Sequence, residues 1–153
     1  MKNFEIVKIK KNHSKELTSI QIENSKEIGN NIWNEKEINS HIDNNFFFGR
    51  VFLYENLIKG FLFGREVDDF FELISIFIIP SLRNKGIGGR MLENCKEFCK
   101  SRMLKEIIIE VSENNLIAKE FYLKKNFYAF GKRKNYYEVS GEKINACLMK
   151  LKI

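Results

Sequence analysis

A polar turn rich in glycine separates two apolar segments in the middle of the chain. The turn is residues 83–89, Arg-Asn-Lys-Gly-Ile-Gly-Gly, and it follows an apolar run closed by Pro80, the only proline. Beyond it, apolar residues recur at spacings of three and four, which predicts a helix over residues 86–102. Backbone N–H groups at the start of a helix bind anions, and glycine lets them approach a phosphate closely. The turn, with its two basic side chains, therefore predicts a site for a phosphorylated ligand.

The turn does not fit the common nucleotide motifs. A P-loop ends in Gly-Lys followed by Ser or Thr, whereas Gly89 is followed by Arg90. A dinucleotide fingerprint, Gly-x-Gly-x-x-Gly, belongs near the start of a βαβ unit, and this turn lies past the middle of the chain. A capped loop without any ligand is the remaining alternative.

The apolar patterns around the turn predict a mixed α/β domain. Strand patterns cover residues 4–10, 46–54, 58–67, 70–79, 106–111, 127–131 and 146–153, with residues 132–137 as a connection. Helical patterns cover residues 14–28, 34–38, 86–102 and a segment capped by Asn114 or Asn115, with Ser14 and Asn34 as further N-caps. Short turns from residue 46 to residue 79 predict an antiparallel meander. A helix precedes the strand at 106–111, so we expect it to run parallel to the strand at 70–79.

Two polar side chains are expected beside the glycine turn. Glu110 lies at the end of the strand at 106–111, and Tyr122 lies on the next helix, in an apolar stripe from Leu116 to Leu123. The carboxyl ends of parallel strands border the ligand site in open α/β sheets, so both side chains can reach it. A solvated strand end for Glu110 and a core position for Tyr122 are the alternatives.

Composition limits the kind of protein further. The 153 residues predict a single domain, and their net charge of +6 favours an anionic ligand or partner. No apolar stretch approaches the roughly eighteen residues of a membrane span, and no basic run with interleaved aromatics indicates nucleic-acid binding. Three cysteines fit a cytoplasmic protein with reduced thiols. Cys95 and Cys99, one helical turn apart, are expected in the core, and no metal site is expected.

The chain resembles the GCN5-related N-acetyltransferases, the GNAT family, over nearly its whole length. Residues 76–88, Ile-Phe-Ile-Ile-Pro-Ser-Leu-Arg-Asn-Lys-Gly-Ile-Gly, are similar to the family's strand and pyrophosphate loop. The spacing of Asn115, Tyr122 and Phe127 is similar to its second signature, although Asn126 stands where Gly is usual. The resemblance implies a mixed, mostly antiparallel sheet of about seven strands flanked by about four helices. Two parallel strands would splay around an acetyl-CoA site.

The resemblance also implies roles for individual residues. Glu110 would be the base that takes a proton from the acceptor amine, and Tyr122 the acid that protonates the departing thiolate. Trp33, Tyr136 and Tyr137 would line the side that accepts the substrate. The residues implied in acetyl-CoA binding are Ile76, Phe77 and Ile78 for the pantetheine arm, Arg83, Asn84, Lys85, Gly86, Ile87, Gly88 and Gly89 for the pyrophosphate, and Asn115.

Within the family, the chain resembles the RimI group, which acetylates the N-terminal alanine of a small-subunit ribosomal protein. Trp33-Asn34-Glu35, residues 109–115 and the run Lys132–Tyr137 carry this likeness, while Asn145 stands where that group usually has Asp. The implied partner is a protein N-terminus, a ribosomal protein by this likeness, with no membrane or nucleic acid involved. The chain would be a monomer or a weak homodimer.

Two other functions stay open at this point. A GNAT enzyme acting on a polyamine, an aminoglycoside or a lysine would need carboxylates around its acceptor groove, and Asp68, Asp69 and Glu72 form a modest cluster. A module that binds acetyl-CoA without catalysis is the second alternative.

Overall fold

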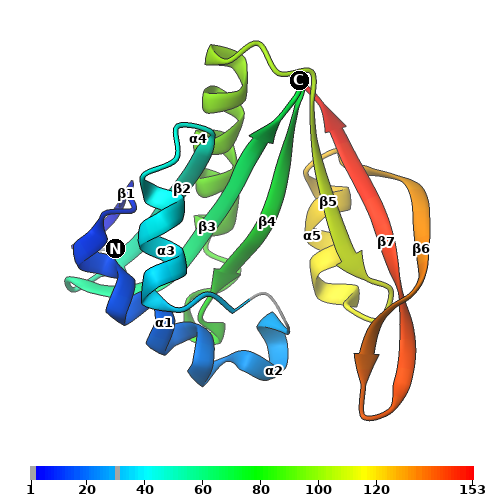
Figure 1. Ribbon diagram of the computed structural model, residues 1–153, viewed down its shortest axis with the longest axis horizontal. Coiled ribbons are helices and arrows are strands. Elements are labelled where there is room, and N and C mark those ends of the chain that lie inside the picture. Colours follow the sequence, from blue (N-terminus) through cyan, green and yellow to red (C-terminus); the bar gives the residue numbers. More distant parts are fainter. Residues whose placement is uncertain (1–2, 30–31) are drawn as a thin grey trace.

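The computed structural model describes residues 3–29 and 32–153 and shows a mixed α/β fold. Seven strands form one sheet in the order β1-β2-β3-β4-β5-β7-β6 (Figure 1). The strands are β1 (Phe4–Lys8), β2 (Phe47–Tyr54), β3 (Leu57–Val67), β4 (Phe70–Ile78), β5 (Glu106–Ser112), β6 (Tyr128–Val139) and β7 (Glu142–Lys152). The helices are α1 (Ser14–Glu23), α2 (Ser25–Ile28), α3 (Glu35–Ile42), α4 (Ile87–Ser101) and α5 (Leu116–Lys124). Short 3₁₀ turns lie at Lys11–His13 and Pro80–Leu82.

The pairing of the strands confirms the predicted topology. Strands β1 to β4 form an antiparallel meander, β4 and β5 are parallel, and β7 pairs antiparallel with both β5 and β6. The β4–β5 pairing covers only Phe70–Leu73 against Glu106–Ile109. Figure 1 shows the two strands together at their starts and diverging toward their carboxyl ends. The sheet is therefore split into two halves that remain joined at one end.

A bulge in β4 accompanies this divergence. Phe63 of β3 pairs with Ser75 of β4, whereas the next residue, Gly64, pairs with Leu73. Ile74 is therefore an extra residue in β4. A Cβ at Gly64 would collide with the Glu72 carbonyl oxygen, so the two strands can approach this closely only with glycine. Such a bulge bends the strand and re-aims its backbone, here just before the segment predicted to hold a cofactor.

Two hydrophobic cores cover the two faces of the sheet. One packs α4 and α5 against the sheet and contains Met91, Cys95, Cys99 and Tyr122 among its buried residues. The other packs α1 and α3 against β2, β3 and β4, around Leu17 and the stacked rings of Phe61 and Phe63 on β3. In Figure 1, α1 and α3 lie in front of the first four strands, while no helix covers the same face of β5, β6 and β7. One face of the second half-sheet is therefore open.

Several predicted elements need correction. The predicted helix at 14–28 breaks at Asn24 into α1 and α2, which gives five helices instead of about four. Ser14 is not the N-cap of α1, because it lies inside the helix and donates its hydroxyl to Asn39 Oδ1 at 2.6 Å. The cap of α3 is confirmed: Asn34 Oδ1 accepts the Glu37 N–H at 2.9 Å.

The C-terminal strands are longer than predicted, and the stripe on α5 is wrong. Residues 132–137 lie within β6 instead of joining two strands, since their polar side chains hide an exposed edge strand. On α5, Leu116, Ile117 and Leu123 are exposed, and only Tyr122 is fully buried. Asn126 follows α5 with a φ of 68°, a conformation that Asn tolerates, so the predicted turn forms without the usual glycine. In the ranges 3–29 and 32–153, no helix is long and apolar enough to span a bilayer.

Candidate functional site

A cleft of about 1740 Å³ opens where β4 and β5 diverge. Its walls are formed by the carboxyl half of β4, the start of α4, β5, α5 and the part of β6 that contains Arg133, Tyr136 and Tyr137. Every predicted site residue except Lys85 lines it: Trp33, Ile76, Phe77, Ile78, Arg83, Asn84, Gly86, Ile87, Gly88, Gly89, Glu110, Asn115, Tyr122, Tyr136 and Tyr137. The structure thus brings together residues from five segments of the chain.

The glycine turn has the backbone geometry of an anion site. Asn84 and Gly86 have φ values of 59° and 78°, so the chain turns sharply before α4 and Gly86 becomes the N-cap. The first N–H groups of a helix have no intrahelical partner and carry a partial positive charge. A Cβ at Gly89 would lie 2.9 Å from Lys125 Nζ, which places that ammonium group over the first turn of α4. These features fit the pyrophosphate of acetyl-CoA.

The two basic side chains of the turn are placed differently from what we expected. Arg83 donates its Nε–H to the Ile78 carbonyl oxygen at 2.8 Å and forms an ion pair with Glu27 of α2 at 2.5 Å. Its guanidinium therefore links α2 to the turn and is already neutralised by a carboxylate. Lys85 is exposed outside the cleft lining. The Lys125 ammonium takes the position near α4 that we had predicted for these two charges.

The edge of β4 offers backbone groups to the cleft. Beyond Leu73, β4 has no partner in β5, while its other edge stays paired with β3 as far as Ile78. The N–H and C=O groups of residues 74–78 that face β5 are consequently available to an extended ligand. Asn115 lines the opposite wall, but its Oδ1 accepts the Ala118 N–H at 3.1 Å as the cap of α5, which leaves only its amide NH₂ for a ligand.

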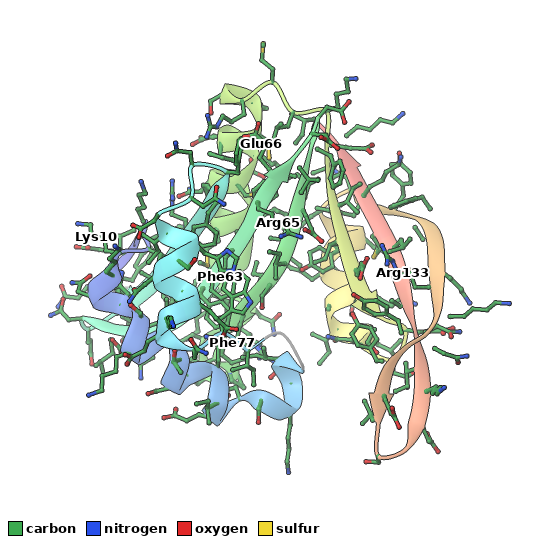
Figure 2. The ribbon with its side chains drawn as sticks, in the orientation of Figure 1. Lys10, Phe63, Arg65, Glu66, Phe77 and Arg133 are labelled. Carbon is green, nitrogen blue, oxygen red and sulfur yellow. The ribbon has the colours of Figure 1, made fainter. Side chains whose placement is uncertain are left out.

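Glu110 lies on the uncovered face of β5, with its side chain 24% exposed. Its Oε1 lies 2.9 Å from Arg133 Nε of β6. Hydrogen bonding of the Tyr136 hydroxyl to Glu110 raises the pKa of Tyr136, with smaller effects from burial and from the Glu110 charge. Figure 2 shows Arg133 beside β5, in the second half-sheet. Glu110 is thus a partly buried carboxylate paired with a cation, which differs from the freely solvated strand end we had weighed.

Tyr122 combines the two interpretations that the sequence left open. Its side chain is 2% exposed and packs edge-on against Phe121 and Phe127, with ring centroids 5.2 Å apart in each pair. It also lines the cleft, opposite β4. Burial raises the pKa of Tyr122 far above its usual range, with a smaller contribution from Cys95. Tyr122 is therefore a core residue whose phenol stays protonated and can donate a proton.

An aromatic cluster forms the end of the cleft beneath α3. The Trp33 ring stacks between His41 at 4.0 Å and Phe63 at 4.7 Å. Burial and the nearby Arg65 lower the pKa of His41, so the imidazole is neutral at pH 7. Arg65 forms an ion pair with Glu72 at 2.7 Å, and Figure 2 places Arg65 on the half-sheet opposite Arg133. The acceptor side of the cleft thus has aromatic walls and paired charges.

Lys125 and Arg133 are among the cleft residues that were not predicted. Lys125 is the C-cap of α5, and a cation three residues after Tyr122 was the signal that could have found it. Arg133 was noted only as part of a motif, and its contact with Glu110 depends on strand pairing that the sequence does not specify. In the part of the chain that the structure describes, no three His, Cys, Asp or Glu gather as metal ligands. Cys95, Cys99 and Cys147 are free and buried.

Comparison with known proteins assigns this chain to a family. The model of the acetyltransferase (GNAT) family matches residues 15–127, so the chain belongs to the GNAT family. This confirms the predicted fold and class, and GNAT acetyltransferases use acetyl-CoA.

Two curated relatives and several solved structures are similar to the chain. It is 33% identical to the uncharacterized protein YxbD of Bacillus subtilis over 73 residues, 48% of this chain and 45% of that protein. It is 32% identical to the putative ribosomal protein bS18-alanine N-acetyltransferase of the same organism over 71 residues, 46% of this chain and 47% of that protein. The chain thus spans about half the length of these curated relatives. The ribosomal-protein-S18-alanine N-acetyltransferase of Escherichia coli has the same fold, with a TM-score of 0.83 at 20% identity, over 99% of this chain and 94% of that one.

Proposed function

We propose that this protein transfers the acetyl group of acetyl-CoA to the N-terminal α-amino group of a protein. Glu110 carries this proposal, because it lies on the open face of β5 beside the unpaired edge of β4, where an extended peptide has room to approach. Two relatives are named as acetyltransferases of a ribosomal-protein alanine, which supports the same acceptor. An α-amino group, with a pKa near 8, is also far easier to deprotonate than a lysine near 10.4.

The proposed chemistry divides the work among residues of this chain. When bound, acetyl-CoA supplies an activated thioester. The N–H groups at the start of α4 and the Lys125 ammonium would hold its phosphates, and the free edge of β4 would hold its extended arm. Glu110 would accept the proton of the amine, directly or through a water, and the Tyr122 phenol would donate a proton to the departing thiolate.

The residues that contact the acceptor peptide and the identity of the partner protein are further parts of this proposal. Tyr136, Tyr137 and Trp33 would contact the incoming peptide, since all three line the cleft on the side of Glu110 or beneath α3. We propose a ribosomal protein in the cytoplasm as the partner, in line with the names of the relatives and with three unpaired cysteines. We further propose that residues 1–153 act as one domain and as a monomer or weak homodimer.

A small amine is the second candidate acceptor, and the structure weakens one argument for it. Of the three predicted carboxylates, only Glu72 lines the cleft, and it is paired with Arg65. Asp69 forms an ion pair with Lys105 at 2.8 Å, just before the start of β4, whereas the glycine turn follows the other end of that strand. Glu138 does line the cleft, so a polyamine or aminoglycoside would still meet negative charge there.

An acceptor panel tests the proposal. It contains a peptide with a free N-terminal alanine, the same peptide N-blocked and carrying an internal lysine, and spermidine. Each is assayed with wild type, Glu110→Gln and, as a matched control outside the cleft, Glu113→Gln. We expect acetylation of the free N-terminus alone, a loss of about a hundredfold or more in Glu110→Gln and no change in Glu113→Gln.

The other results of the panel have definite meanings. Acetylation of spermidine or of the lysine peptide, but not of the free N-terminus, would replace the proposed acceptor by a small amine or a lysine. Silence on all three with acetyl-CoA still bound would contradict a transferase of this range and favour the binding module.

A further inference from the structure

A bulge in β6 brings two of its side chains to the same carboxylate. Arg133 pairs with Ala146 and Tyr137 pairs with Ile144, so four steps along β6 correspond to two steps along β7. The bulged residues are 134–136, and Asn135 has a φ of 53°. A bulge of this kind bends the strand and turns its side chains away from regular alternation.

Regular alternation would not produce the observed contacts. Residues three apart on an unbroken strand point to opposite faces of the sheet, so Arg133 and Tyr136 would be separated by the sheet. With the bulge, Arg133 contacts Glu110 at 2.9 Å and its guanidinium lies 5.5 Å from the Tyr136 ring centroid, so both side chains lie on the side of Glu110. The bulge is thus the feature that directs both groups to Glu110.

A single side chain fixes the bulge. Asn145 of β7 accepts the Asn135 N–H on its Oδ1 at 2.9 Å, and this N–H has left the regular ladder. An Asp carboxylate at position 145 would offer the same kind of acceptor atom. The hydrogen-bond acceptor at position 145 is therefore the property that matters, and the amide NH₂ is not.

We propose that Arg133 and Asn145 are positioning residues for Glu110, which rests on the proposed function in that Glu110 serves there as the base. Arg133 holds the Glu110 carboxylate on the uncovered face of β5, toward the place where an acceptor amine would lie. Asn145 acts one step further away, by holding the bulge in the shape that presents Arg133 and Tyr136.

Kinetics of Arg133 variants test the first part. For Arg133→Gln we expect kcat to fall about ten- to a hundredfold with the KM for acetyl-CoA unchanged, because misplacing a reacting group costs rate while the cofactor side is untouched. Arg133→Lys should recover part of the rate. Lys132→Gln is the matched control, because Lys132 is the neighbouring cation, pairs with Glu113 at 3.3 Å and lies outside the cleft lining.

Position 145 tests the second part by rescue. Asn145→Asp keeps the acceptor oxygen, so we expect it to retain the wild-type kcat within about threefold, whereas Asn145→Leu should behave like Arg133→Gln. Equal rates in Arg133→Gln and wild type, or equal losses in Asn145→Asp and Asn145→Leu, would overturn the proposal.

Crystal structures keep this proposal separate from the acceptor question. The position of the Glu110 side chain is compared in wild type, Arg133→Gln and Lys132→Gln. We expect the carboxylate to leave its place on the uncovered face of β5 in Arg133→Gln alone. An unchanged Glu110 side chain would refute the positioning role, whatever acceptor the panel identifies, while a failed panel with a displaced Glu110 would refute only the acceptor.

Discussion

Replacing Tyr122 by Phe isolates one hydroxyl group in a packed environment. The ring contacts with Phe121 and Phe127, both at 5.2 Å between centroids, survive the substitution, so the core keeps its volume. We expect the free energy of unfolding to change by less than about 1.5 kcal/mol, the usual net contribution of one hydrogen-bonding group. Folding and cofactor binding should therefore be close to wild type in the variant.

Catalysis should respond much more strongly than stability. A positioned general acid contributes about 10²- to 10⁴-fold, so loss of the Tyr122 hydroxyl should lower kcat at least about a hundredfold, or about 2.7 kcal/mol in the barrier. Because burial keeps this phenol protonated, wild-type activity should show no decline from Tyr122 ionisation up to pH 10. The assay is acetyl transfer at saturating acetyl-CoA, with chemical denaturation as the control for folding. A kcat within about threefold of wild type in a folded variant would refute the role of Tyr122 as the acid.

Two further predictions concern charge at the cleft. Lys125→Gln removes the ammonium group near Gly89, so we expect the Kd for coenzyme A, measured by calorimetry, to rise about three- to tenfold at low salt and less at high salt. Lys100→Gln, in the last turn of α4, is the control. Equal affinities of Lys125→Gln and wild type for coenzyme A would contradict a contact between Lys125 and the cofactor. Burial, with the Glu110 charge, raises the pKa of Tyr137 to about 12. Its unfolded phenol ionises near pH 10, so stability is full below pH 10 and is lost as pH rises from 10 to about 12. The melting temperature should fall less steeply over that range in Tyr137→Phe, and identical slopes would argue against this assignment.

The strands and the open face of Glu110 could be predicted because they depend on local patterns. Alternation along β5 buries Ile107, Ile109 and Val111 and leaves Glu110 on the other face, as period two requires. A helix between two strand patterns forces a crossover, and this made β4 and β5 parallel. The first inference uses alternation along one strand and the second uses the order of three consecutive elements, so in both cases the sequence pattern translates directly into geometry.

The features that sequence did not predict depend on partners far along the chain. Arg83 looked like a ligand for phosphate, but its carboxylate partner Glu27 comes from α2 and was not recognisable as a neighbour. The polar run at 132–137 looked like a loop because an exposed edge strand needs no apolar alternation. Its bulge depends on Asn145 of the neighbouring strand, so neither the strand nor its aim at Glu110 could be read from residues 132–137 alone.

The divergence of β4 and β5 explains why one site can meet two unlike ligands. A continuous sheet would pair both edges of β4, whereas the bulge beside Gly64 ends the β5 pairing at Leu73 and frees the backbone beyond it. The same separation leaves room between β5 and the start of α4. There the unpaired N–H groups of the first turn of α4 lie near the ammonium group of Lys125, the residue that follows α5. On the other side of the gap, Glu110 lies on a face that no helix covers (Figure 1). An anionic cofactor and an amine therefore have separate approaches, and they meet only where the two strands part.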